Sequence, residues 1–263
     1  RIENSRAVLP IADLWRSSDA AVWDAALARY WDFILPRNLE LERTLERLDA
    51  RRVLSLDALV DQFLLTDYFR WKYTAPNRYA TTTRQLRRYL VDDGLRELDA
   101  IRERLLNLDP TNIRGGLKAA CEIRGLGTAG ASGLLALLYP ETFGTVDQFV
   151  VKALCGVKDM PEAATIARMN PYSLSITNGV CLITIMQRRA AENNAIFGTS
   201  TWTPRNIDKV LWTYGGEILF DMQPNYGMQA TPVNFVPFHQ RARRRPRLHP
   251  TTAPVEGQGE LGL

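Results

Sequence analysis

The sequence predicts an all-α protein, and three observations support this fold class. Apolar residues recur every three or four positions through most of the chain, as they do on the buried face of a helix. Capping residues, glycines and prolines punctuate these segments. Two-residue alternation is scarce, and residues 79–85 ("YATTTRQ") are the one short stretch with strong β preference. These features predict about ten helices.

In the first half of the chain, four helical segments follow this pattern. Residues 17–33 begin with a Ser/Asp cap and then place Val22, Trp23, Ala26 and Tyr30 at helical spacing. The other expected helices cover 40–53, 55–71 with Ser55 as its cap, and 96–108.

The second half of the chain contains a long apolar segment and a sharply bounded last helix. Residues 170–194 are apolar enough to form a central helix. In 203–216, Thr203 is expected to cap the helix, Pro204 to occupy its first position and Gly215 to end it.

The chain has 263 residues, enough for one large domain, which we expect to span 1–238. The helical pattern fades from about Asp221, and residues 239–263, with the block "RARRRPRL", predict a flexible basic tail. No apolar run reaches about 18 residues, and the N-terminal residues lack the apolar core of a signal peptide. We therefore expect a cytoplasmic monomer with no membrane partner.

Cysteine and histidine usage argues against metal chemistry. Cys121, Cys155 and Cys181 form no C-x-x-C pair, and His239 and His249 both lie in the tail. We expect no metal site and no cofactor. A net charge of +4 permits a polyanionic partner without requiring one.

The motif "GLGTAG", Gly125 to Gly130, matches the dinucleotide-binding pattern G-x-G-x-x-G, and Asp147 follows it. That interpretation needs a strand before the first glycine. The preceding apolar residues, Ile113, Leu117, Ala120 and Ile123, have helical spacing, and the chain offers no set of parallel strands. The sequence therefore disfavours a nucleotide-cofactor site.

A helix-hairpin-helix over about 112–138 fits the same residues. Gly125 and Gly127 allow positive φ in the turn, and the amides of Gly127, Thr128, Ala129 and Gly130 begin the second helix. The turn either binds nucleic acid phosphate or joins two helices and binds nothing.

Residues 124–154 ("RGLGTAGASGLLALLYPETFGTVDQFVVKAL") resemble the core of the helix-hairpin-helix DNA glycosylases, which include 8-oxoguanine glycosylase and endonuclease III. The resemblance is specific over 112–154, and residues 209–220 ("KVLWTYGGEILF") are similar to the late helix that closes the base pocket in the 8-oxoguanine branch. It implies a two-lobed helical glycosylase fold, double-stranded DNA with a flipped base as partner, and Asp147 as the catalytic carboxylate.

One departure from the family pattern concerns the catalytic lysine. Bifunctional members carry a lysine where this chain has Ala129, so the resemblance implies a monofunctional hydrolytic enzyme without lyase activity. Lys118 and Lys152 are the nearest substitutes by sequence, and both are better explained as surface or phosphate-contacting residues. The four-cysteine iron–sulfur loop of the endonuclease III branch is also missing.

Cleavage of an N-glycosidic bond develops positive charge on the sugar, and a fixed carboxylate stabilises that charge. Asp147 fits this role and could orient the attacking water; the alternative is that it only caps the following helix. For the base pocket the candidates are Asp208, Trp212 and Tyr214, although Trp212 could equally be core.

Asn77 and Arg78, in a loop expected to start at Pro76, and Lys72 are candidates for a DNA wedge or clamp. A solvated basic helix face explains Arg84, Arg87 and Arg88 as well as DNA binding does. The sequence thus favours a DNA glycosylase that excises a modified base, in repair or against hypermodified phage DNA. The alternative is a non-catalytic DNA-binding module.

Overall fold

The computed structural model describes residues 8–91 and 94–222, and in this part of the chain the regular secondary structure is all helical, with no strand. The all-α prediction is confirmed. The expected tail, 239–263, and both histidines lie outside the described residues.

The elements follow one another as short and long helices. The first are α1 (Ile11–Arg16), α2 (Ala20–Ala28), the 3-10 segments η1 (Arg29–Phe33) and η2 (Pro36–Asn38), and α3 (Leu39–Leu45). Next come α4 (Ala50–Leu54), the π-helix η3 (Val60–Tyr68), α5 (Phe69–Lys72), α6 (Pro76–Val91) and α7 (Leu95–Leu106). The last are α8 (Ile113–Cys121), α9 (Thr128–Leu138), α10 (Gln148–Leu154), α11 (Ala163–Ile166), α12 (Ile176–Phe197) and α13 (Pro204–Met222).

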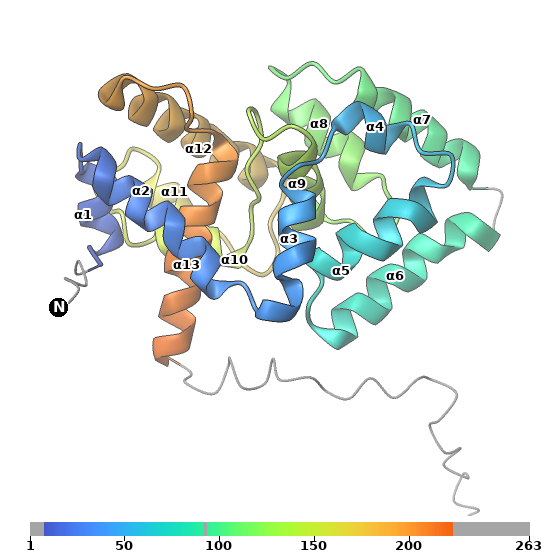
Figure 1. Ribbon diagram of the computed structural model, residues 1–263, viewed down its shortest axis with the longest axis horizontal. Helices are drawn as coiled ribbons and strands as arrows, with labels where there is room; N and C mark the ends of the chain where they lie inside the picture. The colour runs from blue at the N-terminus through green and yellow to red at the C-terminus, as the bar shows by residue number, and fades with distance from the viewer. Residues whose placement is uncertain (1–7, 92–93, 223–263) are drawn as a thin grey trace, which may run out of the picture.

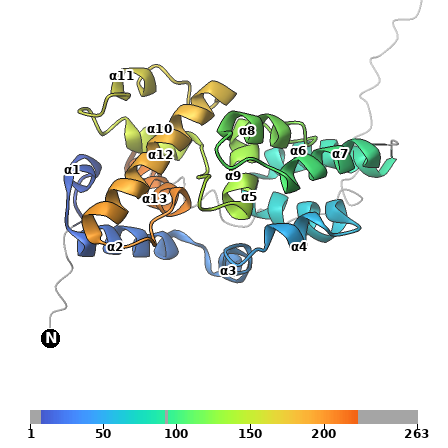
Figure 2. The ribbon, with the colours of Figure 1, turned by 90° about the horizontal axis from the view of Figure 1, so that it is seen from above.

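These helices form two groups, which both ribbon views separate (Figures 1 and 2). One group holds the first helices, α1 and α2, together with α10 to α13; the other holds α4 to α8. The chain therefore leaves the first group after α2 and returns to it at α10. Helices α3 and α9 lie near the boundary, and α12 also packs on α8 and α9.

Local sequence features explain several helix boundaries. Asp19 caps α2 as predicted, its carboxylate accepting from the Ala21 amide at 2.9 Å. The single helix expected over 40–53 is divided instead, because the Asp49 side chain accepts from the Arg52 amide and starts α4. Ser55 follows the end of α4 and does not cap the next helix.

The threonine-rich stretch with β preference lies inside α6. The hydroxyls of Thr81 and Thr82 donate to the carbonyls of Asn77 and Arg78 at 2.9 and 2.8 Å. These bonds to the preceding turn satisfy the threonine hydroxyls within the helix, so β propensity does not decide the local structure.

Gly215 does not end the last helix, contrary to the prediction from its sequence. Helix α13 continues through Gly215 to Met222. A Cβ atom at Gly215 would overlap the carbonyl group of Phe149, in the first turn of α10. The glycine therefore allows α13 and α10 to pack closely, and this contact fixes the start of α10.

One continuous apolar core joins the two groups of helices. Helix α9 is buried along most of its length, and Leu134 and Leu135 are almost inaccessible. Within 8–91 and 94–222, no helix is long and apolar enough to cross a membrane.

Candidate functional site

The predicted hairpin corresponds to α8, a turn over 122–127, and α9. Asn112 caps α8 by accepting from the Gly115 amide at 2.8 Å. In the turn, Gly125 has φ of +93°, and a Cβ atom there would lie 2.7 Å from the carbonyl oxygen of Thr82. Tyr73 donates its hydroxyl to the Gly125 carbonyl at 3.0 Å. The fold itself therefore requires glycine at 125.

Gly127 differs from Gly125, because only Gly125 adopts the positive φ that glycine allows at both positions. Gly127 precedes α9 with φ of −94°, and a Cβ atom there would meet nothing within 4 Å. The amides of Gly127, Thr128, Ala129 and Gly130 have no acceptor in the part of the chain that the structure describes. Four unpaired amides at a helix N-terminus favour an anion, and the missing side chain leaves room for it.

Asp147 caps α10 through only one of its carboxylate oxygens. Oδ1 accepts from the amides of Phe149 at 2.9 Å and Val150 at 3.2 Å. Oδ2 accepts no hydrogen bond from any described residue, and the side chain is 16% exposed. The carboxylate is thus held at a helix N-terminus by Oδ1, while Oδ2 has no hydrogen bond.

The residues just before Asp147 are fixed from two helices. Ser132 of α9 accepts from the Val146 amide at 2.9 Å, and Asp208 of α13 accepts from the Thr145 amide at 2.5 Å. At Gly144 a Cβ atom would overlap Met186. These contacts determine where the Asp147 backbone lies.

Lys72, at the end of α5, forms a long ion pair with Oδ2 of Asp147. Its Nζ lies 3.9 Å from Oδ2, and its side chain is 11% exposed. The aliphatic stem crosses Gly133, whose absent Cβ would lie 3.4 Å from the lysine Cδ. Burial lowers the pKa of Lys72, although the nearby Asp147 and Asp208 act in the opposite direction.

Beneath this pair lies a buried ionic cluster centred on Arg205 of α13. The guanidinium contacts Asp208 at 2.8 Å, Glu46 at 3.0 Å and Glu42 at 3.3 Å. Tyr30 and Trp71 both donate to Glu42, and Lys209 pairs with Glu46. The cluster joins α13 to α3, which begins the passage between the two groups of helices.

Asp208 is almost inaccessible, at 2% exposed, and both of its oxygens are engaged, one by Arg205 and one by the Thr145 amide. Burial raises the pKa of this carboxyl to about 6, against the opposing effect of Arg205. Asp208 therefore holds the loop that precedes Asp147.

Trp212 and Tyr214 occupy different surroundings, although both are on α13. The Trp212 ring packs edge-on against Phe149, with centroids 5.8 Å apart, and against Tyr30 at 5.6 Å. Because Phe149 is in the first turn of α10, Trp212 lies near the site. Tyr214 donates its hydroxyl to the Leu9 carbonyl at 2.9 Å and packs under Arg29, so it contacts the N-terminal helices.

Asn77 and Arg78 lie in the first turn of α6 and not in the expected loop, because α6 begins at Pro76. Proline suits this position, since its fixed φ is helical and the missing amide would be unpaired there. Both side chains belong to exposed residues. Arg78 is close enough to Tyr73 to lower its pKa, which burial raises to about 12 overall. The clamp candidate Arg78 is thus near the hairpin turn.

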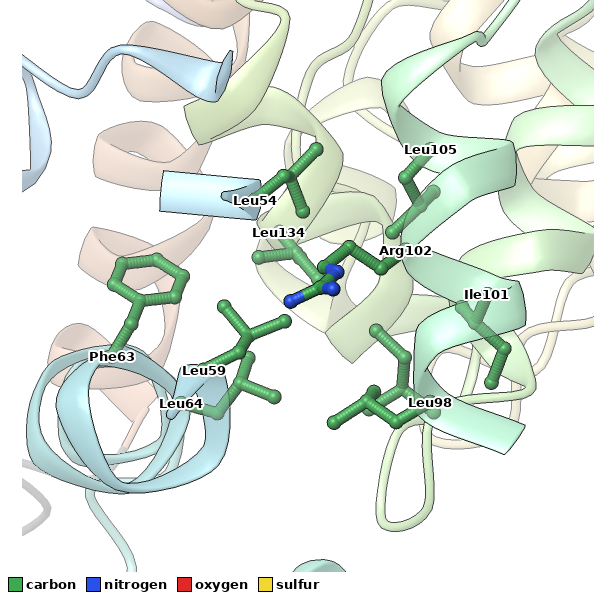
Figure 3. Close-up of a pocket in the computed structure, with 10 residues that line it drawn as sticks. Leu54, Leu59, Phe63, Leu64, Leu98, Ile101, Arg102, Leu105 and Leu134 are labelled. Atoms are coloured by element: carbon green, nitrogen blue, oxygen red, sulfur yellow. The ribbon is translucent and has the colours of Figure 1, made fainter. Parts of the chain in front are cut away.

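Two cavities are lined by other residues. Figure 3 shows a small apolar one between α4, η3 and α7, with Leu59, Leu64 and Leu98 on its walls and Arg102 reaching in. The second is a groove beside Trp15, Met160 and Arg188. In the described part of the chain, no group of three or more His, Cys, Asp or Glu side chains could hold a metal ion.

Sequence reasoning missed three members of the site: Glu42, Ser132 and Arg205. Glu42 and Arg205 are charged residues within amphipathic helical segments. Their neighbours in the sequence do not account for the contacts that the fold gives them. One signal was present for Arg205, since Asp208 follows it at the i+3 position of the same helix. Ser132 carries no sequence signal, because its role depends on the loop that folds back beside α9.

Comparison of the chain with models of protein families, with curated proteins and with solved structures finds no match. The resemblance to DNA glycosylases therefore depends on the residues quoted for it.

Proposed function

We propose that the protein is a DNA glycosylase with a two-lobed helical fold, which hydrolyses the N-glycosidic bond of a modified base. The observation that carries the proposal concerns Oδ2 of Asp147, which accepts no hydrogen bond from a described residue and is fixed in place because Oδ1 is bonded to two helix amides. A carboxylate held in this way needs no reorganisation when positive charge develops on the sugar. It is also placed to orient the attacking water.

The start of α9 supports DNA as the partner. Four unpaired amides and an open position at Gly127 suit a phosphate, and the exposed Arg78 near Tyr73 adds positive charge on the same side of the turn. Base excision further requires a flipped nucleotide. We propose that Trp212, through its contact with Phe149, forms part of the wall that receives it.

A second candidate is a DNA-binding module without catalysis. It is favoured by the capping role of Asp147, which by itself explains an aspartate at this position. Both candidates predict phosphate binding by the hairpin. They differ in whether removal of the Asp147 charge abolishes a reaction.

Base release from DNA distinguishes these candidates. Wild type and Asp147→Asn are incubated with duplexes carrying oxidised, alkylated or mispaired bases and with glucosylated phage DNA. Free base is measured by mass spectrometry, and abasic sites by strand breakage in alkali. Asp159→Asn, which removes an exposed carboxylate paired with Arg16, is the matched control.

We expect free base from wild type and from the control, and none from Asp147→Asn, with DNA affinity in that variant unchanged or higher. Equal release by Asp147→Asn would show that the carboxylate is not catalytic. Salt-dependent DNA binding without release from any of these substrates would favour the binding module.

A further inference from the structure

We propose that Arg205 of α13 is a positioning residue for base excision, and that it acts through the loop that precedes Asp147. The proposal rests on the proposed function, because it assigns a role to a buried group beneath the carboxylate that would carry the reaction. It also links that carboxylate to α3, which lies near the boundary between the two groups of helices (Figure 1).

Arg205 and Asp208 hold the same residue of that loop, Thr145. Nη1 of Arg205 donates to Oδ1 of Asp208 at 2.8 Å, and Oδ2 of Asp208 accepts from the Thr145 amide at 2.5 Å. The same Nη1 also donates to the Thr145 hydroxyl at 3.5 Å. Because Thr145 is two residues before Asp147, the loss of these contacts would shift the backbone that carries the carboxylate.

Carboxylates of α3 fix the other terminal nitrogen of the Arg205 guanidinium. Nη2 lies 3.0 Å from Glu46 and 3.3 Å from Glu42. Glu42 is 2% exposed, and it also accepts from Tyr30 of η1 and Trp71 of α5. The guanidinium therefore has carboxylate partners at both terminal nitrogens, and it cannot turn away from the loop without breaking buried ion pairs.

Net stability does not account for this cluster. Arg205 is buried, and its Nε has no hydrogen-bond partner among the described residues. Desolvation of buried charges offsets much of their mutual attraction, and an unpaired buried donor adds a further cost. The pKa of Asp208 reflects the same cost, because burial raises it to about 6 despite the neighbouring guanidinium. What the cluster provides instead is a fixed position for Thr145.

The burial of Arg205 determines what its loss would change. Its side chain is 6% exposed and that of Asp208 is 2% exposed, so neither group reaches a bound duplex. A positioning role then predicts a lower rate of base release at saturating DNA and an unchanged DNA affinity. The rate is sensitive to position, because a misplacement of about 1 Å at a reacting group can cost about 100-fold.

The test compares Arg205→Gln and Arg205→Lys with Arg189→Gln as the matched control. Arg189 is also a buried arginine of a long helix, α12, where it donates to Asn193 at 2.9 Å and to the Trp15 carbonyl at 2.8 Å. Single-turnover base release is measured at saturating DNA on the modified duplexes of the previous experiment, and DNA affinity by fluorescence anisotropy. Hydrogen–deuterium exchange of the peptide over 143–150 is measured on the folded protein without DNA.

We expect Arg205→Gln to lose at least about 10-fold in the rate of base release, with DNA affinity unchanged and part of the rate restored in Arg205→Lys. Exchange over 143–150 is expected to increase in Arg205→Gln and to stay at the wild-type level in Arg189→Gln. Combining Arg205→Gln with Asp208→Asn is expected to give a variant no slower than Asp208→Asn alone, because the two residues act through the same amide. Melting temperatures show whether each variant is folded, and Arg205→Lys decides the outcome if Arg205→Gln is not.

A wild-type rate and wild-type exchange in the folded Arg205 variants would overturn this inference and leave the proposed function intact. An equal loss of rate in Arg189→Gln would also overturn it, because the loss would then follow from general destabilisation. Increased exchange over 143–150 in Arg205→Gln, with no base release by wild type from any duplex, would refute the proposed function and leave Arg205 as the residue that holds the loop before Asp147.

Discussion

The carboxylate of Asp208 accepts a hydrogen bond from the backbone amide of Thr145 at 2.5 Å, and so ties α13 to the loop that leads into Asp147. Ser132 of α9 holds the next amide of the same loop, that of Val146. The position of Asp147 therefore depends on α9 and α13, and not only on the helix that it caps.

Replacing Asp147 separates its capping role from its charge. Asparagine caps helices about as well as aspartate, so Asp147→Asn is expected to keep the stability of wild type, whereas Asp147→Ala loses about 1 kcal/mol. Both variants are expected to lose base release by about 10²- to 10³-fold, because neither provides the charge. Urea unfolding and base-release rates measured on the same preparations check this. Catalysis by Asp147→Asn at the wild-type rate would mean that the cap alone matters.

The two hairpin glycines are expected to respond differently to substitution. Gly125→Ala places a side chain at φ of +93° and close to the Thr82 carbonyl, so we expect about 1–3 kcal/mol of destabilisation. Gly127→Val has open space and an ordinary φ, so stability changes little while DNA affinity falls. Thermal unfolding and fluorescence anisotropy at several salt concentrations measure the two effects. Unchanged DNA affinity in Gly127→Val would show that the α9 amides do not bind phosphate.

Asp208 predicts a pH dependence of stability with a definite sign. Burial raises the pKa of its carboxyl from the ordinary value of 3.8 to about 6 in the folded protein. The folded state therefore binds the proton more tightly than the unfolded state does between these values. This stabilising contribution is fully present below pH 3.8 and is lost as the pH rises through about 6.

The measurement compares wild type with Asp208→Asn, which cannot titrate. The free energy of unfolding is obtained from urea titrations between about pH 4 and pH 7, and the mutant value is subtracted from the wild-type value. We expect this difference to decrease as the pH rises. The subtraction removes the contributions of carboxyls outside the cluster, such as Asp109, whose pKa is lowered by its hydrogen bonds to Thr111. If the difference in unfolding free energy increased with pH, the raised pKa of Asp208 would be contradicted.

Neighbouring glycines in α13 provide a matched pair. A Cβ atom at Gly215 would overlap the Phe149 carbonyl, so Gly215→Ala is expected to push α13 away from α10 and destabilise the protein by about 1–3 kcal/mol. A Cβ atom at Gly216 meets nothing within 4 Å, and Gly216→Ala is expected to stabilise the helix by about 0.5–1 kcal/mol. Thermal unfolding of both variants is the check. Similar changes in melting temperature in the two variants would show that the α10–α13 contact is not close.

Much of the secondary structure was predictable because it depends on local signals. The spacing of Val22, Trp23 and Ala26 indicates a helix, and Asp19 and Thr203 start helices by accepting nearby amides. Predictions failed where a distant contact overrides a local preference. Gly215 has the sequence context of a helix end, but the helix continues because its missing side chain is needed against Phe149.

The candidate site was predictable in part. Gly125 and Asp147 stand out in the sequence, since a turn needs the first and a helix start favours the second. The partners of Asp147 were not predictable. The sequence indicates Lys72 only as a clamp for DNA and indicates no role for Arg205, Glu42 or Ser132, because their roles follow from the way separate helices meet.

The sequence by itself determined an all-helical chain, the hairpin turn with its glycines, and an aspartate at the start of a helix, because each depends on residues within a few positions of one another. The tertiary structure alone decided that Lys72 faces Asp147, that Asp208 holds the loop before it, and that Arg205 gathers carboxylates from α3 and α13. Packing of distant helices sets these distances, and burial at the contacts shifts the pKa values of Lys72 and Asp208. Neither can be derived from the spacing of residues along the chain.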